Sequence, residues 1–397
     1  MTDAIIAVTI YALALVWLVA FSLKFKPVGD ELREYQCYQS ICKTGKMSIE
    51  EHILLSSCPL ATYLPYLVNK VLKTDALKIY SIMPCIWFAM MPMFGYLTAR
   101  LYLSIPLSVL TVLFICSNFQ FCFYPANGRN SIAVGILAGL IYGLLAGNLW
   151  LAVVFVVLLV VAHYGTAHFT LYVLGMSWLI MTVTGNEYRG LSTALIFLLA
   201  GIWIWFNFIS KGAGSVIKGF IKNTVNGRSP IIQKQQAAVK PVNPYLSFET
   251  RDAVVSSAAG RNWQLMSAPQ RIEFIASWLV VIILSVGAVV AVIEHGGLFR
   301  LLIITGYSAI LIAIAVPHVS VYYGVVRTYF TALTILAPCF IIGAAAITQA
   351  IGISVYWLAI PIIGVYGLQV SGIGYKMFRI DKQARIKNSL AQYWSGG

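Results

Sequence analysis

Long apolar blocks, separated by short polar segments, make up most of this chain. The blocks are close to the length of about 20 residues that an α-helix needs to cross a bilayer. They cover residues 4–25, 77–98, 104–123, 131–146, 149–162, 169–184, 191–209, 272–293, 299–316, 329–351 and 355–373. The pattern predicts an all-α polytopic membrane protein with about eleven transmembrane helices, in a range of about nine to twelve. The range reflects the short blocks at 131–146 and 149–162, which either cross with a tilt or dip in and return.

Polar segments divide the chain into four parts. The parts are an N-terminal membrane module (1–209), a basic polar loop or small subdomain (210–271), a C-terminal part with four helices (272–375) and a basic tail (376–397). The segment at 210–271 contains nine Lys or Arg residues and two acids. We therefore expect one continuous membrane domain that is interrupted by a single long polar segment.

The first polar loop, residues 27–76, contains an apolar stretch of its own. Residues 53–72 are mostly apolar but include Pro59, Pro65 and Lys70. A proline inside a helix removes a backbone hydrogen bond and kinks or ends the helix. We therefore expect short interfacial or re-entrant helices in this loop rather than a span.

Composition narrows the class of protein. Hydrophobic residues make up 60% of the chain and charged residues 10%, whereas soluble domains carry about 25% charged residues. This difference excludes a soluble globular enzyme. The 27 Lys and Arg residues outnumber the 13 Asp and Glu residues, which gives a net charge of +14. In a membrane protein this excess predicts contact with anionic lipid headgroups, and no nucleic-acid-binding motif accompanies it.

The charge distribution also bears on orientation. With eleven crossings, the first loop, the long polar segment and the tail share one side of the membrane, and that side holds most Lys and Arg residues. The positive-inside rule favours a cytoplasmic position for it. The N-terminal apolar block has neither a basic n-region nor a small-residue cleavage site, so we expect it to be retained as the first span.

Acidic residues gather just after the first apolar block. Five of the thirteen lie within 22 residues of one another: Asp30, Glu31, Glu34, Glu50 and Glu51. If this segment is helical, Glu31 and Glu34 share one face, with Tyr35 and Tyr38 alongside. A carboxylate at the membrane surface can act as a general base toward a hydroxyl group, or can bind a divalent ion that bridges a diphosphate. The alternative is a solvated loop in which Asp30 caps the following helix.

The seven cysteines form no metal-ligand pattern. Most lie in apolar blocks, where cysteine acts as a small hydrophobic residue. Cys37 and Cys42 lie in the polar loop and can pair with each other in an oxidising compartment. No cofactor is certain from the sequence; if the protein uses a divalent cation, Mg²⁺ or Mn²⁺, we expect Asp30 and Glu31 as its ligands.

Short motifs give the chain a resemblance to a known family. They are Gly29-Asp30-Glu31 with Tyr35 and Thr44-Gly45, His163-Tyr-Gly-Thr-Ala167, Trp203-Ile-Trp-Phe206, and Arg327 with Leu336-Ala-Pro338. The first set resembles the N-terminal module of membrane glycosyltransferases of the GT-C class, which includes protein O-mannosyltransferases and aminoarabinose transferases. The other sets resemble an uncharacterised group of archaeal multi-spanning proteins that share this fold. Together the motifs extend over most of the chain.

The resemblance implies a GT-C-like fold and an inverting transfer of a hexose or pentose from a polyprenyl- (dolichyl-) phosphate donor at the external membrane face. It assigns the catalytic carboxylate to Asp30 and places Glu31 beside it. The transition state is oxocarbenium-like, so positive charge builds on the sugar while negative charge builds on the departing phosphate. The candidates for binding the donor phosphate are Arg129, His163, Tyr164, His168 and Arg327. The residues expected to support the first loop are Arg33, as ion-pair partner or phosphate ligand, Glu34 and Tyr35.

Other interpretations stay open. Histidines between helices are often satisfied by interhelical hydrogen bonds, and Arg129 and Arg327 can anchor the chain at lipid headgroups. The chain also lacks the large soluble domain that many GT-C enzymes carry after their last span. The alternatives are a non-catalytic GT-C-like subunit of a larger complex, and a transporter or flippase of lipid-linked or anionic solutes. In each case we expect a multi-pass protein of the cell membrane, with a lipid-linked sugar, membrane lipids or other subunits as partners.

Overall fold

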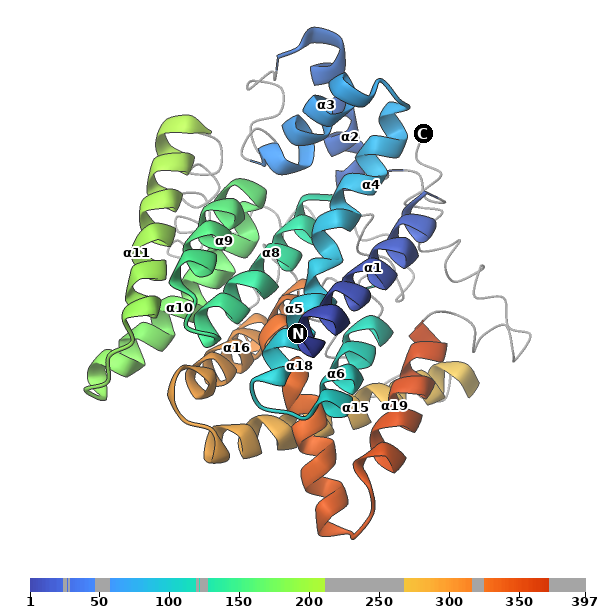
Figure 1. Ribbon diagram of the computed structural model, residues 1–397, viewed down its shortest axis with the longest axis vertical. Helices are drawn as coiled ribbons and strands as arrows, with labels where there is room; N and C mark the ends of the chain where they lie inside the picture. Colours follow the sequence, from blue (N-terminus) through green and yellow to red (C-terminus); the bar gives the residue numbers. More distant parts are fainter. Residues whose placement is uncertain are drawn as a thin grey trace, which may run out of the picture.

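The computed structural model describes residues 1–23, 27, 29–46, 58–118, 121, 128–210, 268–315 and 325–370. Within these residues every regular element is a helix (Figure 1). Eight helical segments are long and apolar enough to span a bilayer, and three shorter apolar helices accompany them. The chain is an all-α polytopic membrane protein, as its sequence predicts.

The helices fall into three groups along the chain. The first group is α1 (Thr2–Ser22), α2 (Gly29–Thr44), α3 (Pro59–Leu72), α4 (Ala76–Phe88), α5 (Met90–Arg100) and α6 (Ile105–Ser117). The second is α8 (Gly128–Leu145), α9 (Leu149–Ala162), α10 (Tyr164–Val183), α11 (Arg189–Ile204) and the π-helix η3 (Trp205–Ile209). The third is α15 (Ala268–Glu294), α16 (Gly297–Ala315), α18 (Val325–Ala350) and α19 (Val355–Val370). Each of the eleven predicted apolar blocks coincides with helices at its position.

Two of the predicted blocks differ in detail from the helices that occupy them. The block at 77–98 contains two helices, α4 and α5, with a break between Phe88 and Met90. Pro92 explains this break, because it lacks an N–H group and its ring clashes with the carbonyl of the fourth residue before it. The block at 191–209 ends in η3, and such π-helical turns are frequent at functional sites.

The first loop folds into α2 and α3, which pack on each other at one end of the bundle (Figure 1). We call this end the α2 end. Helix α3 begins at Pro59, in the first turn where a missing N–H group is tolerated. The predicted short helices of this loop are thus present, although residues 53–57 of the predicted apolar stretch lie outside the described residues.

The opposite end of the bundle, the far end, is tied together by polar and aromatic contacts. Asp3, at the start of α1, forms an ion pair of 2.8 Å with Arg100, at the end of α5. The ring of Tyr102 stacks on that of Phe299, at the start of α16, with centroids 4.0 Å apart. Helices α1 and α16 thus begin at the far end, whereas α5 ends there.

Helices α15 and α18 cross with their backbones in close contact. A Cβ atom at Gly287 would overlap the backbone carbonyl of Cys339, and a Cβ atom at Gly343 would overlap that of Ile283. Small residues allow this kind of approach, which is how many membrane helices associate. Because α18 also packs on α5, α6 and α8, the crossing holds the C-terminal helices against the N-terminal part and places Arg327 near α8.

Candidate functional site

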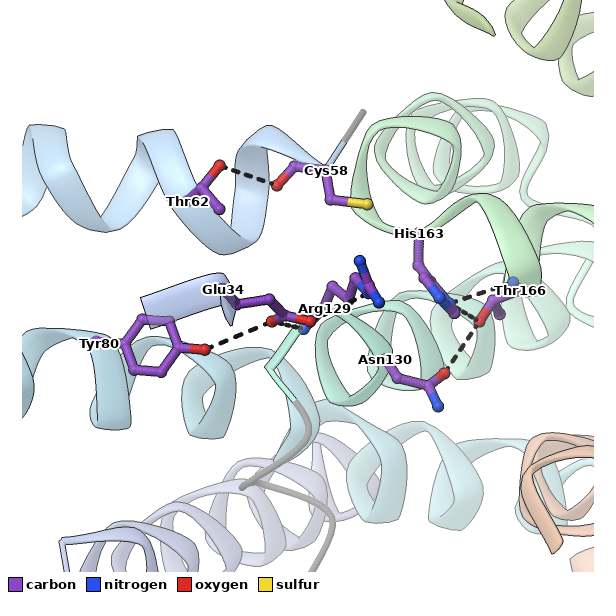
Figure 2. A network of polar contacts seen from close by, with 8 residues as sticks. All are labelled: Glu34, Cys58, Thr62, Tyr80, Arg129, Asn130, His163 and Thr166. Atoms are coloured by element: carbon purple, nitrogen blue, oxygen red, sulfur yellow. Dashed lines mark hydrogen bonds and ion pairs between the residues drawn. The ribbon is translucent and has the colours of Figure 1, made fainter. Parts of the chain in front are cut away.

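Glu34 connects α2 to the membrane helices (Figure 2). Its side chain is 0% exposed. The carboxylate lies 3.1 Å from Nε of Arg129, and it accepts hydrogen bonds from the backbone N–H of Arg129 at 3.3 Å and from the Tyr80 hydroxyl group at 3.5 Å. Burying a carboxylate is costly unless it is both paired and hydrogen-bonded. Glu34 meets both conditions through contacts with α4 and α8.

The N-terminus of α8 provides a binding site for the Glu34 carboxylate. The first N–H groups of a helix have no partner within the helix, and they favour a negative charge nearby. Gly128 provides the space, because a Cβ atom at this position would overlap the Glu34 carboxylate. The two residues Gly128 and Arg129 therefore supply room, helix N–H groups and a cation together.

A second set of hydrogen bonds lies directly beside Arg129. His163 is buried where α9 ends and α10 begins, and its Nδ1 accepts a hydrogen bond of 3.3 Å from the backbone N–H of Thr166. The Thr166 hydroxyl group lies 2.9 Å from the same nitrogen and donates a hydrogen bond of 3.3 Å to the side-chain oxygen of Asn130. His163 thereby caps α10, and the set joins α10 to α8 (Figure 2).

Tyr164 and Arg327 extend this set. The Arg129 guanidinium lies 5.8 Å from the centroid of the Tyr164 ring, within the range of a cation–π interaction. Arg327, in the first turn of α18, lies within electrostatic range of His163. Four residues that the resemblance places near the donor phosphate thus come together at the α2 end. We call this group the α8–α10 junction; it comprises Arg129, Asn130, His163, Tyr164, Thr166 and Arg327.

His168, the fifth predicted phosphate-side residue, packs elsewhere on α10. Its Nδ1 lies within hydrogen-bonding distance of the Tyr164 carbonyl oxygen, and its ring stacks on Phe206 of η3 with centroids 5.7 Å apart. His163 is the cap residue before α10, whereas His168 lies in the second turn of that helix. The contact with η3 places His168 at the periphery of the junction.

The predicted catalytic acids lie at the start of α2. Its backbone is helical from Gly29 to Thr44, so the condition under which Glu31 and Glu34 share a face is met, and Asp30 and Glu31 occupy the first turn. Their side chains, like residues Glu50 and Glu51, lie outside the described residues. The catalytic and metal-binding roles of these acids stay predictions. Among the described residues, no group of three or more His, Cys, Asp and Glu side chains is placed to hold a metal ion.

The rest of the inner face of α2 is aromatic and apolar. The rings of Tyr35 and Tyr38 lie 5.2 Å and 5.7 Å from the ring of Tyr80. Cys37 and Ile41 are buried on this face. Burial raises the pKa of the Cys37 thiol to about 11, and it also raises the pKa values of the Tyr35 and Tyr38 hydroxyl groups. Cys37 is therefore inaccessible and almost entirely protonated at neutral pH.

The possible disulfide between Cys37 and Cys42 is absent, and both residues are free thiols. Both lie on α2, and side chains five positions apart on one helix point in directions that a disulfide cannot join. Cys42 is partly exposed, unlike Cys37, and Arg33 is exposed near the start of the same helix.

Sequence reasoning missed three residues of this site. Asn130 and Thr166 had a local signal, since Asn130 follows the predicted Arg129 and Thr166 is the third residue after a helix-capping histidine. Tyr80 had none, because its partner Glu34 lies 46 positions earlier in the chain. Only the fold brings such distant polar groups together.

Comparison with models of known protein families gives no match to this chain, and neither does comparison with curated protein sequences. The fold and the site define a multi-pass α-helical membrane protein with a buried ion pair at one end of its bundle. Its activity must be argued from the residues at that end.

Proposed function

We propose that this protein is a membrane glycosyltransferase of the GT-C type. It transfers a hexose or pentose from a polyprenyl- or dolichyl-phosphate donor to an acceptor, at the external face of the cell membrane and with inversion. Asp30 is the catalytic carboxylate, with Glu31 beside it. The α8–α10 junction binds the donor phosphate.

One observation carries this proposal: Glu34 attaches the acid-bearing helix α2 to the cationic junction. Glycosyl transfer from a phosphate needs a carboxylate where the acceptor loses its proton, and cations or hydrogen-bond donors where the phosphate leaves. The chain brings its acidic helix and these cations to the same end of the bundle, although Glu34 and Arg129 are 95 positions apart in sequence.

In the proposed reaction the acceptor oxygen attacks the anomeric carbon of the sugar while the bond from that carbon to the phosphate oxygen breaks. Asp30 takes the proton of the acceptor hydroxyl group. The phosphate leaves with the bonding electron pair, and its charge is stabilised by Arg327 and by polar groups of the junction. The attacking and leaving oxygens lie on opposite faces of the sugar, so the configuration inverts.

Substitution of Asp30 tests the catalytic assignment. We expect Asp30→Asn to reduce sugar transfer by about 10²- to 10⁴-fold, the usual contribution of a general base, while the amount of protein in the membrane is unchanged. Transfer is measured in membrane vesicles with a polyprenyl-phosphate sugar as donor. Glu187→Gln is the matched control, because Glu187 is exposed in the turn between α10 and α11. Transfer by Asp30→Asn at the rate of this control would remove Asp30 from the mechanism.

Two other results would favour the alternative functions. A folded wild-type protein that transfers no sugar and co-purifies with a second protein would identify a non-catalytic subunit. Flux of a lipid-linked or anionic solute into sealed vesicles would identify a transporter.

A further inference from the structure

We infer that Glu34 is a positioning residue: its ion pair with Arg129 docks α2 on α8 and so fixes the register of the Asp30 turn relative to the α8–α10 junction. The roles of Asp30 and the junction rest on the proposed function. The docking of α2 by Glu34 does not, and it can be tested without any substrate.

The inner face of α2 shows why a charged residue is needed for this docking. Among the described side chains of α2, the buried ones are Glu34, Cys37, Tyr38 and Ile41, which follow the spacing of one helical face. Apolar burial is non-directional, so the last three residues favour contact with the bundle but leave α2 free to slide or rotate. The carboxylate of Glu34 removes this freedom, because it must meet a guanidinium and an N–H group at fixed distances.

The register set by Glu34 is passed directly to the predicted catalytic turn. Residues four apart on a helix share a face, and they are separated by about 6 Å along its axis. The backbone of α2 is helical from Gly29, so position 30 lies one turn before Glu34 on the same face. A shift of α2 by a single residue would move that position by about 1.5 Å and rotate it by about 100°.

The ion pair also implies different roles for the two arginines of the junction, Arg129 and Arg327. The charge of Arg129 is balanced by Glu34 inside the protein. Arg327 lies on a different helix, α18, and the proposed function assigns it to the donor phosphate. Substitutions at Glu34 and Arg129 should therefore have the same effect and should not add, whereas substitution of Arg327 should act separately.

The docking is tested by the reactivity of Cys37. The measurement uses the full-length protein with Cys37 as its single cysteine and a thiol reagent. In the parent protein Cys37 is buried and should react slowly. We expect Glu34→Ala to raise its labelling rate by at least about 10-fold through local opening of α2. Arg129→Ala should do the same, the double substitution no more, and Glu187→Gln nothing.

A second reporter separates local opening from unfolding. Cys339 is fully buried in α18, and as the single cysteine it should stay protected in Glu34→Ala. If Glu34→Ala exposes both cysteines, the isosteric Glu34→Gln is measured in the same way. Protection of Cys37 in a folded Glu34 variant would overturn the inference.

The kinetics of sugar transfer test the part of the inference that depends on the proposed function. We expect Glu34→Gln to lower kcat by about 100-fold, the effect of a small misplacement, with little change in donor KM, and Glu34→Asp to recover part of it. Arg327→Gln should instead raise donor KM. If Asp30→Asn is inactive while Glu34→Gln is fully active, the positioning role fails and the proposed function stands. If Cys37 responds as expected but the parent protein transfers no sugar, the docking stands and the function fails.

Discussion

The stability of the fold depends on the contacts of the Glu34 carboxylate with Arg129 and Tyr80. Removing one partner of a buried ion pair usually costs about 3–5 kcal/mol, because the other charge is left buried alone. Glu34 is fully buried against Arg129 and Tyr80, so it belongs to this class. If Glu34 is replaced by an uncharged residue, Arg129 stays buried without this partner. The fold then loses stability unless α2 separates from α8 and lets water reach the arginine.

The sequence names Glu34 as a support of the first loop, but it does not identify the partner of this carboxylate. Glu34 is one of five acids in the cluster, and the resemblance assigns the catalytic role to Asp30 and its neighbour Glu31. What sets Glu34 apart is a partner 95 positions away. Spacing along one helix identifies residues that share a face, but it does not identify what that face meets.

Gly128→Ala tests the same contact from the side of α8. A Cβ atom at this position would overlap the Glu34 carboxylate, so we expect a loss of about 1–3 kcal/mol, as is typical of overpacking, and faster labelling of Cys37. Gly175→Ala in α10 is the matched control, since a Cβ atom there meets nothing within 4 Å. Alanine should be neutral or stabilising at this control position. Thermal unfolding in detergent measures both variants, and equal behaviour of the two would show that the space at Gly128 is not needed.

At the scale of elements, apolar length and period predicted nearly every helix. The blocks coincide with the membrane helices. For the segment that forms α2, the sequence left a helix and a solvated loop open, and the structure has the helix. The break before Met90 was missed, although Pro92 carries the signal for it. The sequence did not predict which helices pack on each other. Most faces of these helices are apolar, so the residue pattern does not show which face meets which neighbour.

The crossing of α15 and α18 is such a contact, and Gly287→Ala tests it. The added Cβ atom would overlap the Cys339 carbonyl, and a backbone atom cannot move aside as a side chain can. We expect the helices to separate, with a loss of about 3 kcal/mol or more, seen as a lower unfolding temperature in detergent. Gly364→Ala in α19 is the control, because a Cβ atom at this position has open space. A stable Gly287→Ala protein would show that this close approach does not hold the bundle together.

For the whole molecule, the described charges differ strongly between the two ends. Toward the far end the basic side chains are Arg100, Arg189 and Arg300, and three acids accompany them: Asp3, Glu187 and Glu294. The helices and turns of the α2 end carry Arg33, Lys43, Lys46, Lys70, Lys73 and Lys78, whereas their described acids are Glu34, which pairs with Arg129, and Asp75. The positive-inside rule therefore favours a cytoplasmic α2 end. The proposed glycosyl transfer requires this end outside.

Two substitutions in a cysteine-free background decide between these orientations. Lys43 is exposed near the end of α2, and Glu187 is exposed before α11, where Tyr188 bonds to the Leu144 carbonyl at the end of α8. If the proposed function holds, a membrane-impermeant thiol reagent should label Lys43→Cys in intact cells and Glu187→Cys only after permeabilisation. The reverse pattern would follow the positive-inside rule and would exclude transfer at the external face. Labelling of both in intact cells would mean that an even number of segments crosses between them, so that one of the short helices α6 and α9 does not cross.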